Sequence, residues 1–320
     1  SCTGCQFQHI DYEEQLNIKR KFVIEELSSV KTFSVEKIDH TFPSINKYEY
    51  RNHARFSVSK TDKYKGNIGF INRWNRKLIP IAKCEIMSMK INSILHQLKN
   101  KLPGYSQFSV RVGVNSDSYL IQPKIPELGN IKTGQDHYHE KINGIDQKIS
   151  SPSFFQVNTT QAENLGKIVK DLLELRGSEV LIDAFSGVGT FAVLLSQYVK
   201  KIYGIESSFS SISDAFYNSK AIKNIEFIHS DVESIEPDIF KEHIDAVILD
   251  PSRKGVHNKA LEWIEKLLPN QIIYVSCELK TLKRDLNKLT NNYSIRKVIP
   301  VDMFPHTKHV ECIVSLEKIN

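Results

Sequence analysis

Cys277 is the residue around which the sequence offers the clearest chemistry. It lies in YVSCELKTLKRD (274–285), which begins with strand-forming residues and continues with a helical pattern. A lone cysteine is usually a small buried apolar residue. At the end of a strand, however, a thiol faces the edge of a sheet, and the first amides of the following helix can lower its pKa. The position therefore indicates a nucleophilic thiolate.

A glycine-containing loop further upstream indicates a nucleotide-like ligand. The run DAFSGVGTFA (183–192) fits the dinucleotide pattern G-x-G-x-x-G/A, so an NAD-type cofactor is a competing interpretation. Asp183 favours S-adenosylmethionine, because a carboxylate here would repel a pyrophosphate but suits the cationic amino-acid end of the methyl donor. Glu206 and Asp231 end the next two expected strands and could reach the ribose and the adenine. The ordinary alternative for each acid is a helix N-cap or a surface residue.

A thiolate beside a methyl donor suits the methylation of a pyrimidine at carbon 5. That carbon is a poor nucleophile, but a thiolate that adds to carbon 6 places electron density on carbon 5, which can then attack the methyl group. The carbon-5 proton must leave before the cysteine is eliminated, so a general base is required. Glu311, in VDMFPHTKHVECIV (301–314), is the candidate base, and His306 and His309 alone would be weak candidates.

The elements that position these residues alternate regularly from about residue 150. Strand-like segments are separated by segments with helical periodicity, which predicts a parallel sheet covered by helices on both faces. Ligands bind such sheets at the carboxyl ends of the strands. The expected fold class is therefore α/β, with a Rossmann-like, doubly wound sheet. The strand segments are 179–185, 201–206, 225–231, 244–250 and 271–277.

Residues 41–145 read as a smaller domain of short strands. Its window 47–77 holds nine basic residues, two acidic residues and six aromatic residues. Basic groups bind phosphates and aromatic faces stack on unpaired bases, so the window could bind RNA. A solvated charged face over an aromatic core is the slightly favoured alternative on this window alone. The basic residues are Lys47, Arg51, Arg55, Lys60, Lys63, Lys65, Arg73, Arg76 and Lys77, and the aromatic residues are Tyr48, Tyr50, Phe56, Tyr64, Phe70 and Trp74.

The N-terminal 40 residues hold a C-x-x-C motif and then a helical pattern over residues 11–30. One face of this helix should be apolar, with Leu16, Val23, Leu27 and Val30, and the other should be basic, with Lys19, Arg20 and Lys21. The chain starts at Ser1, so we expect a trimmed chain or a fragment.

Composition sets broad limits on the class of protein. The chain has 320 residues and a net charge of +6, which permits a polyanionic partner without requiring one. No apolar run approaches the length of a membrane span. Five scattered cysteines argue against a disulfide framework, so we expect reduced thiols and a cytoplasmic protein. A monomer is the default expectation.

At this point the sequence resembles the RNA uracil-5-methyltransferases that act on tRNA and 23S ribosomal RNA. The similarity runs from Ser1 to the C-terminus and is dense in SPSFFQVN, DAFSGVGTF, LDPSRKG, YVSCELKTLKRD and DMFPHTKHVE. It implies a class I methyltransferase domain, with Cys277 as nucleophile and Glu311 as base. It also implies a cofactor and target-base pocket lined by Gln156, Phe185, Thr190, Glu206, Asp231 and Asp250. Gln156 and Asp250 resemble the groups that hold the uracil edge.

The chain departs from the family pattern at several of these motifs. Ser186 and Thr190 stand where cysteine and asparagine are usual, and Ser252 replaces a proline. Glu278 and Leu279 replace the usual Asn-Pro, so a negative charge lies beside the thiolate. No catalytic group is lost.

The N-terminal cysteines resemble those of relatives with a [4Fe–4S] cluster, which four thiolates normally hold. Cys2 and Cys5 match the C-x-x-C pair and Cys84 the distant ligand, while the leading cysteine would precede Ser1. We therefore expect the cluster in a longer form of the chain. A zinc half-site, a redox pair or free thiols are the alternatives.

The character of the sequence changes twice along the chain, which predicts three parts, and the resemblance suggests their roles: a cysteine motif with its helix (1–40), an RNA-binding domain (41–145) and a methyltransferase domain (146–320). The cluster motif favours 23S ribosomal RNA as substrate, with the T-loop of tRNA as the alternative. Two other classes stay open, namely a methyltransferase for a protein or small molecule and a non-catalytic RNA-binding or iron–sulfur protein.

Overall fold

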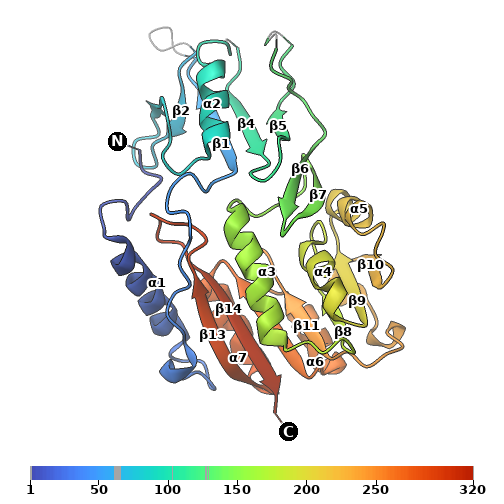
Figure 1. Cartoon of the computed structure of the whole chain (residues 1–320). Coiled ribbons are helices and arrows are strands. Elements are labelled where there is room, and N and C mark those ends of the chain that lie inside the picture. Colours follow the sequence, from blue (N-terminus) through green and yellow to red (C-terminus); the bar gives the residue numbers. More distant parts are fainter. Residues whose placement is uncertain (1, 61–65, 103, 127, 129, 320) are drawn as a thin grey trace.

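The computed structural model describes residues 2–60, 66–102, 104–126, 128 and 130–319. A small antiparallel sheet lies above a larger mixed sheet, and a two-stranded hairpin lies between them (Figure 1). Three residues of the basic and aromatic window, Lys63, Tyr64 and Lys65, lie outside the described residues.

The small sheet has the strand order β3-β2-β1-β4-β5. Its strands are β1 (His53–Val58), β2 (Ile68–Ile71), β3 (Leu78–Pro80), β4 (Gln107–Val112) and β5 (Tyr119–Gln122). Phe56 and Phe108 pack in its core with ring centroids 5.2 Å apart, and helix α2 (Met89–Leu98) contributes to the same core. The sequence predicts the strands here but not the helix.

The hairpin consists of β6 (His137–Ile142) and β7 (Ile145–Ser150), so it includes residue 145, at which the sequence places a domain boundary. Its buried Glu140 accepts hydrogen bonds from the backbone of Val114 in the small domain and from Thr159 at the start of helix α3 (Thr159–Leu173). One carboxylate thereby ties the hairpin to both neighbours.

The large sheet has the order β10-β9-β8-β11-β12-β14-β13. The first five strands are mutually parallel, and β14 pairs antiparallel with both β12 and β13. The predicted α/β class and doubly wound sheet are confirmed; the antiparallel pair at the edge was not predicted. The strands are β8 (Val180–Asp183), β9 (Lys201–Glu206), β10 (Ile225–His229), β11 (Ala246–Leu249), β12 (Gln271–Ser276), β13 (Tyr293–Val301) and β14 (Glu311–Lys318).

Helices cover both faces of this sheet. Helices α3 (Thr159–Leu173), α4 (Thr190–Leu195) and α5 (Phe209–Asn218) pack on one face. Helices α1 (Tyr12–Leu27), α6 (Asn258–Leu267) and α7 (Leu279–Leu289) pack on the other. Short 3₁₀ turns complete the chain at η1 (Val35–Lys37), η3 (Ser196–Tyr198), η4 (Val232–Ser234) and η5 (Pro237–Ile239).

Helix α1 belongs in space to the large sheet, although it precedes the small one in sequence (Figure 1). Its expected apolar face is buried as predicted. The prediction that Lys19 lies on the opposite, basic face is wrong, because its side chain is fully buried against Asp302 at 2.5 Å. Lys19 continues the spacing of Leu16 and Val23, so it shares their face.

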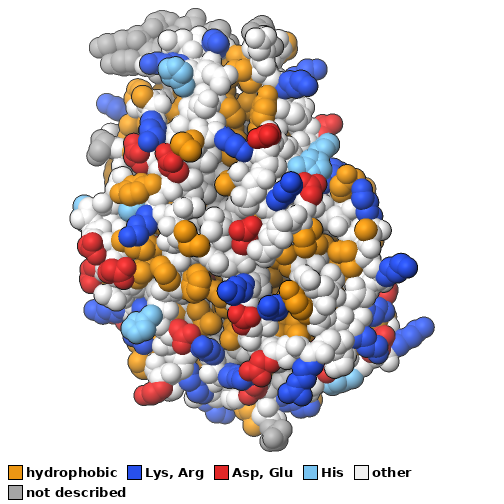
Figure 2. All heavy atoms as spheres, viewed as in Figure 1, with side chains coloured by type: hydrophobic (Ala, Val, Ile, Leu, Met, Phe, Trp, Pro, Cys, Tyr) orange, Lys and Arg blue, Asp and Glu red, His pale blue; other side chains and the backbone are white. Residues whose placement is uncertain are grey.

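Charged side chains of both signs are interspersed over the face drawn in Figure 2, with no large patch of one sign. The positive excess of the chain is therefore spread out on this face. No helix in the described part of the chain is both long and apolar enough to cross a membrane.

Candidate active site

The carboxyl ends of the parallel strands bring the predicted residues to one edge of the large sheet. Asp250 follows β11 and Cys277 follows β12. Strand β14 runs the other way, so it starts at this same edge with Glu311. Since Ser276 pairs with Cys312, the next residues outward, Cys277 and Glu311, lie side by side.

A cleft of about 1380 Å³ opens at this edge and extends up to the small sheet. Most of the predicted site residues line it. They are Gln156, Phe185, Thr190, Glu206, Asp250, Cys277 and Glu311, together with Cys2, Cys5 and Cys84. Asp231 is exposed after β10 and does not line the cleft.

Burial shifts the thiol and carboxyl groups in the cleft toward their neutral forms. Burial raises the pKa of Cys277 to about 11, and the charges of Glu311 and Asp250 add to this effect. Burial, with Asp250 nearby, also raises the pKa of Glu311 well above its usual value. Burial raises the pKa of Asp250 to about 7. Arg253 opposes the shifts of Cys277 and Glu311, so a positive charge in the cleft favours their ionised forms.

The loop after β8 lets its backbone approach a ligand. Gly187 and Gly189 have φ values of +54° and +85°, which glycine adopts readily. A Cβ at Gly187 would meet nothing within 4 Å, whereas one at Gly189 would lie 2.9 Å from a Phe227 ring atom. Glu206 fixes the loop by accepting hydrogen bonds from the backbone of Gly187 at 2.9 Å and of Ser208 at 2.6 Å.

Two side chains beside this loop have polar groups without partners among the described residues. Both carboxyl oxygens of the fully buried Asp183 lack a hydrogen bond. Burial, with the charge of Asp250 nearby, raises its pKa to about 8. Thr190 donates to Gln147 from the hairpin at 2.9 Å, and the amide nitrogen of Gln147 is unpaired. Gln147 lies outside the recognised motifs, and nothing in the sequence singles it out.

Comparison with known proteins identifies the family. A family model described as tRNA (uracil-5-)-methyltransferase matches residues 129–319. An uncharacterized RNA methyltransferase of Clostridium tetani is 32% identical over 98% of this chain and 80% of its own length. Another, of Nanoarchaeum equitans, is 33% identical over 99% of this chain and 78% of its own length. The chain belongs to the tRNA (uracil-5-)-methyltransferase family.

A solved structure supports the same conclusion along the whole chain. The tRNA (uracil-54, C5)-methyltransferase of Pyrococcus abyssi, in complex with S-adenosyl-L-homocysteine, superposes with a TM-score of 0.80 at 25% identity. The match covers 98% of this chain and 86% of that one. The predicted family and enzyme class are thereby confirmed, and this uracil-5-methyltransferase has the expected class I fold.

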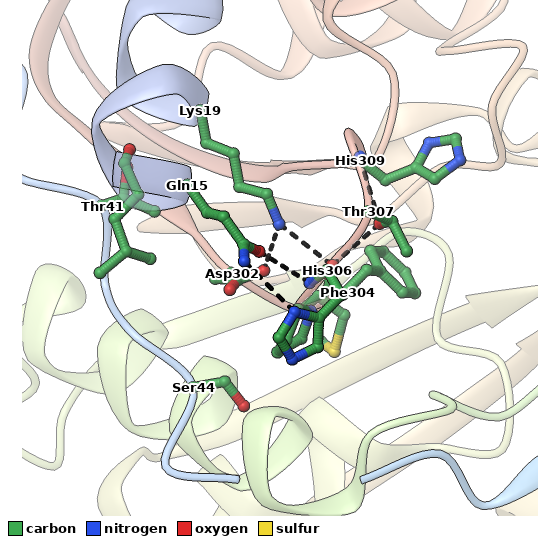
Figure 3. A network of polar contacts seen from close by, with 12 residues as sticks. Gln15, Lys19, Thr41, Ser44, Asp302, Phe304, His306, Thr307 and His309 are labelled. Atoms are coloured by element: carbon green, nitrogen blue, oxygen red, sulfur yellow. Dashed lines mark hydrogen bonds and ion pairs between the residues drawn. The ribbon is translucent and has the colours of Figure 1, made fainter. Parts of the chain in front are cut away.

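The loop of residues 302–310, which leads into Glu311, is held by helix α1 of this uracil-5-methyltransferase (Figure 3). Lys19 donates to the Asp302 carboxylate and to the Phe304 carbonyl at 3.0 Å. Gln15 accepts from the His306 backbone at 2.9 Å, and its amide nitrogen lies 3.2 Å from His306 Nδ1. The loop therefore has fixed contacts on its α1 side.

Other segments hold the same loop from its remaining sides. From the start of α3, Asn158 donates to the Met303 carbonyl at 3.1 Å and Gln161 to the Asp302 carbonyl at 3.0 Å. Tyr50 donates to the Pro305 carbonyl at 3.0 Å. These contacts hold the backbone before Glu311 rigidly, and a site residue needs such a support to keep its position.

Cys2, Cys5 and Cys84 all line the cleft of this family member. The charges of Cys84 and Cys2 add to burial in raising the pKa of Cys5 to about 11, so the thiols lie near one another. Among the described residues, however, no group of three or more Cys, His, Asp or Glu side chains is arranged to hold a metal ion. The expected [4Fe–4S] cluster is therefore not supported by the arrangement of the described residues.

Proposed function

We propose that this protein transfers a methyl group from S-adenosylmethionine to carbon 5 of a uridine in structured RNA. The observation that carries the proposal is the position of Cys277 beside Glu311 in one cleft, at the edge of the sheet where ligands bind such folds. The family and its similarity to the Pyrococcus tRNA enzyme support the substrate class.

In the proposed mechanism, Cys277 and Glu311 act in succession on the uracil ring. The thiolate of Cys277 forms a bond to carbon 6, and the resulting enolate makes carbon 5 a nucleophile. After the methyl group has been transferred to carbon 5, Glu311 removes the proton that carbon 5 still carries. The electron pair of that C–H bond re-forms the ring double bond and expels the thiolate. The pKa values of Cys277 and Glu311 are both raised, so a higher pH is needed to ionise these groups. Glu311 can act as the base only in its ionised form.

Other cleft residues hold the two substrates in this proposal. S-adenosylmethionine supplies the electrophilic methyl group, and carboxylates of the cleft would attract its positive sulfonium when they are ionised. Phe185, Thr190 and Glu206 line the side of the cleft next to the glycine loop, where we place the donor. Gln156 and Asp250 also line the cleft and would hold the uracil edge; a carboxyl with a pKa of about 7 can donate or accept a hydrogen bond there.

Trapping with 5-fluorouridine RNA tests the nucleophile, because fluorine replaces the proton that the base must remove. Wild-type protein with the donor should form a covalent RNA complex on a denaturing gel, and Cys277→Ser should not. Cys84→Ser is the matched control, since it removes another half-buried free thiol of the same cleft and should still give the complex. A complex that persists in Cys277→Ser would refute the proposed nucleophile.

The base has a separate signature with ordinary RNA. In Glu311→Gln the methylated adduct should form but fail to resolve, so a covalent complex accumulates without fluorine. Rapid turnover by Glu311→Gln would exclude this role for Glu311.

The RNA itself is the finer part of the proposal. The expectation of 23S ribosomal RNA depends on a cluster that the described residues do not support, whereas the similarity to the Pyrococcus enzyme favours the alternative, a tRNA T-loop. Incubation of tRNA and of 23S fragments with labelled donor, followed by mapping of the modified uridine, distinguishes the two.

A further inference from the structure

The turn between β2 and β3, residues 72–77, presents an unusually exposed aromatic side chain. Trp74 is 86% exposed, the largest fraction among the exposed large hydrophobic residues of the described chain. A side chain of this size is normally at least partly buried. The uracil chemistry proposed above does not use it.

The turn is held in a defined shape, so the tryptophan is presented by a rigid support. The Asn72 side chain accepts hydrogen bonds from the backbone of Trp74 at 2.8 Å and of Asn75 at 3.3 Å. The backbone of Asn72 donates to Lys77 at 2.9 Å and accepts from Arg76 at 3.0 Å. Because the backbone is already ordered, a ligand that stacks on Trp74 need not order it on binding.

The turn also lies at the mouth of the active-site cleft. Its Arg73 lines the cleft and donates a backbone hydrogen bond to Thr3 at 3.3 Å. Burial lowers the pKa of His309, and the charges of Arg253, Lys308 and Arg73 add to this effect. Arg73 is therefore close to the 302–310 loop, and the turn reaches from the small sheet toward the methyl-transfer centre.

The charges around Trp74 indicate a polyanionic ligand. The six residues of the turn include three cations, Arg73, Arg76 and Lys77, and no acid. Arg51 and Arg55 line the same cleft as Arg73. A rigid aromatic ring among cations is the arrangement with which proteins bind single-stranded nucleic acid, because the ring stacks on a base while the cations hold the backbone phosphates.

We propose that Trp74 is a stacking platform for an unpaired base of the RNA strand whose uridine enters the cleft. The identity of that strand as substrate depends on the proposed function; the stacking itself does not. The platform would bind a base outside the cleft, so it would contribute to RNA affinity and placement rather than to the chemical step. It predicts a preference for loops over fully paired RNA.

Intrinsic fluorescence offers a direct test, because the chain has only two tryptophans. The other, Trp263, is 4% exposed within the core of the large domain. Titration of the whole protein with single-stranded octa-uridylate should quench the emission of Trp74, and a twelve-base-pair RNA duplex should quench it much less. The emission of Trp74→Phe, which retains Trp263 alone, should not change with either RNA.

Affinity measurements distinguish base stacking on Trp74 from general electrostatic attraction. Loss of one base–aromatic stack weakens binding by about 5- to 150-fold, so Trp74→Leu should raise the Kd for octa-uridylate within this range. Trp74→Phe should remain within a few-fold of wild type because its ring still stacks. Arg76→Gln should flatten the salt dependence of Kd, whereas Trp74→Leu should leave that slope unchanged.

The proposal would be overturned if Trp74→Leu bound octa-uridylate as tightly as wild type, or if the RNA left the emission of the wild-type protein unchanged. The latter result would be expected if the exposed ring served a protein partner instead. Methylation assays keep the two proposals distinct. Absence of methyl transfer to any RNA, with quenching intact, would refute the proposed function and leave the platform standing. Normal methyl transfer by Trp74→Leu at unchanged KM would refute only the platform.

Discussion

Replacement of Lys19 by methionine should destabilise the protein far more than the loss of an ordinary ion pair. Both Lys19 and Asp302 have fully buried side chains, and Asp302 Oδ2 has no hydrogen-bond partner among the described residues. Methionine would fill a similar volume but leave a buried carboxylate without its cation, which costs about 3–5 kcal/mol. With an unfolding entropy of about 2.1 cal/mol/K per residue, a chain of 320 residues should show a fall in Tm of roughly 4–7 °C.

A surface pair provides the matched control for this measurement. Lys297 and Asp39 lie 3.0 Å apart, and each side chain is 44% exposed. Lys297→Met should therefore change stability by only about 0–1 kcal/mol. The double variant Lys19→Met with Asp302→Leu should recover most of the lost Tm, because an apolar pair can replace a buried ion pair at little cost.

Thermal unfolding followed by circular dichroism at pH 7 gives the comparison, with methyl transfer measured well below Tm. Since Lys19 also holds the Phe304 carbonyl in the loop before Glu311, we expect folded Lys19→Met to lose kcat with little change in KM. Equal Tm losses in Lys19→Met and Lys297→Met would refute the reasoning. So would a double variant no more stable than Lys19→Met.

Three further predictions concern the cleft. The pKa values of Cys277 and Glu311 are both raised, and both groups must be ionised for the reaction. The single-turnover rate should therefore increase with pH from 7 to 9, by up to about tenfold per pH unit for the thiol. A chemical step whose rate did not change with pH would contradict this. Arg253→Gln removes the cation that opposes both shifts, so its profile should move to higher pH, which a pH series on both proteins would detect. Gly189→Ala should weaken donor binding, measured by calorimetry, and lower Tm more than Gly187→Ala, because only the first meets neighbouring atoms; equal effects would argue against the steric explanation.

The parallel part of the fold was predictable because its signal is local. Each strand of residues 179–277 is a short apolar run, and a helical pattern follows every one of them except 225–231. The edge pair β13 and β14 was not predictable in this way, because the partner of a strand is set by tertiary contacts. Helix α2 was missed because the strand pattern around it dominated the interpretation of residues 41–145.

Most of the site residues could be predicted from their positions at the ends of strands. They place Asp250 and Cys277 at one edge of the sheet, whereas Glu311 reaches that edge only because β14 runs antiparallel. Lys19 was assigned to the wrong face because charged residues were expected in solvent. Its spacing from Leu16 and Val23 was the available signal, since it lies on their apolar stripe.

The position of α1 has a consequence for how the protein is made. Val23, Leu27 and Val30 share a core with Leu282 and Val298, yet the ribosome completes the first group long before the second. With β13 starting at Tyr293 and translation at about 5–20 residues per second, the nascent helix waits on the order of 15–50 s for its partners. The apolar face of α1 must be shielded from other chains during this time. Slower translation or the loss of a chaperone should therefore lower the yield of folded protein, even when the finished enzyme is stable.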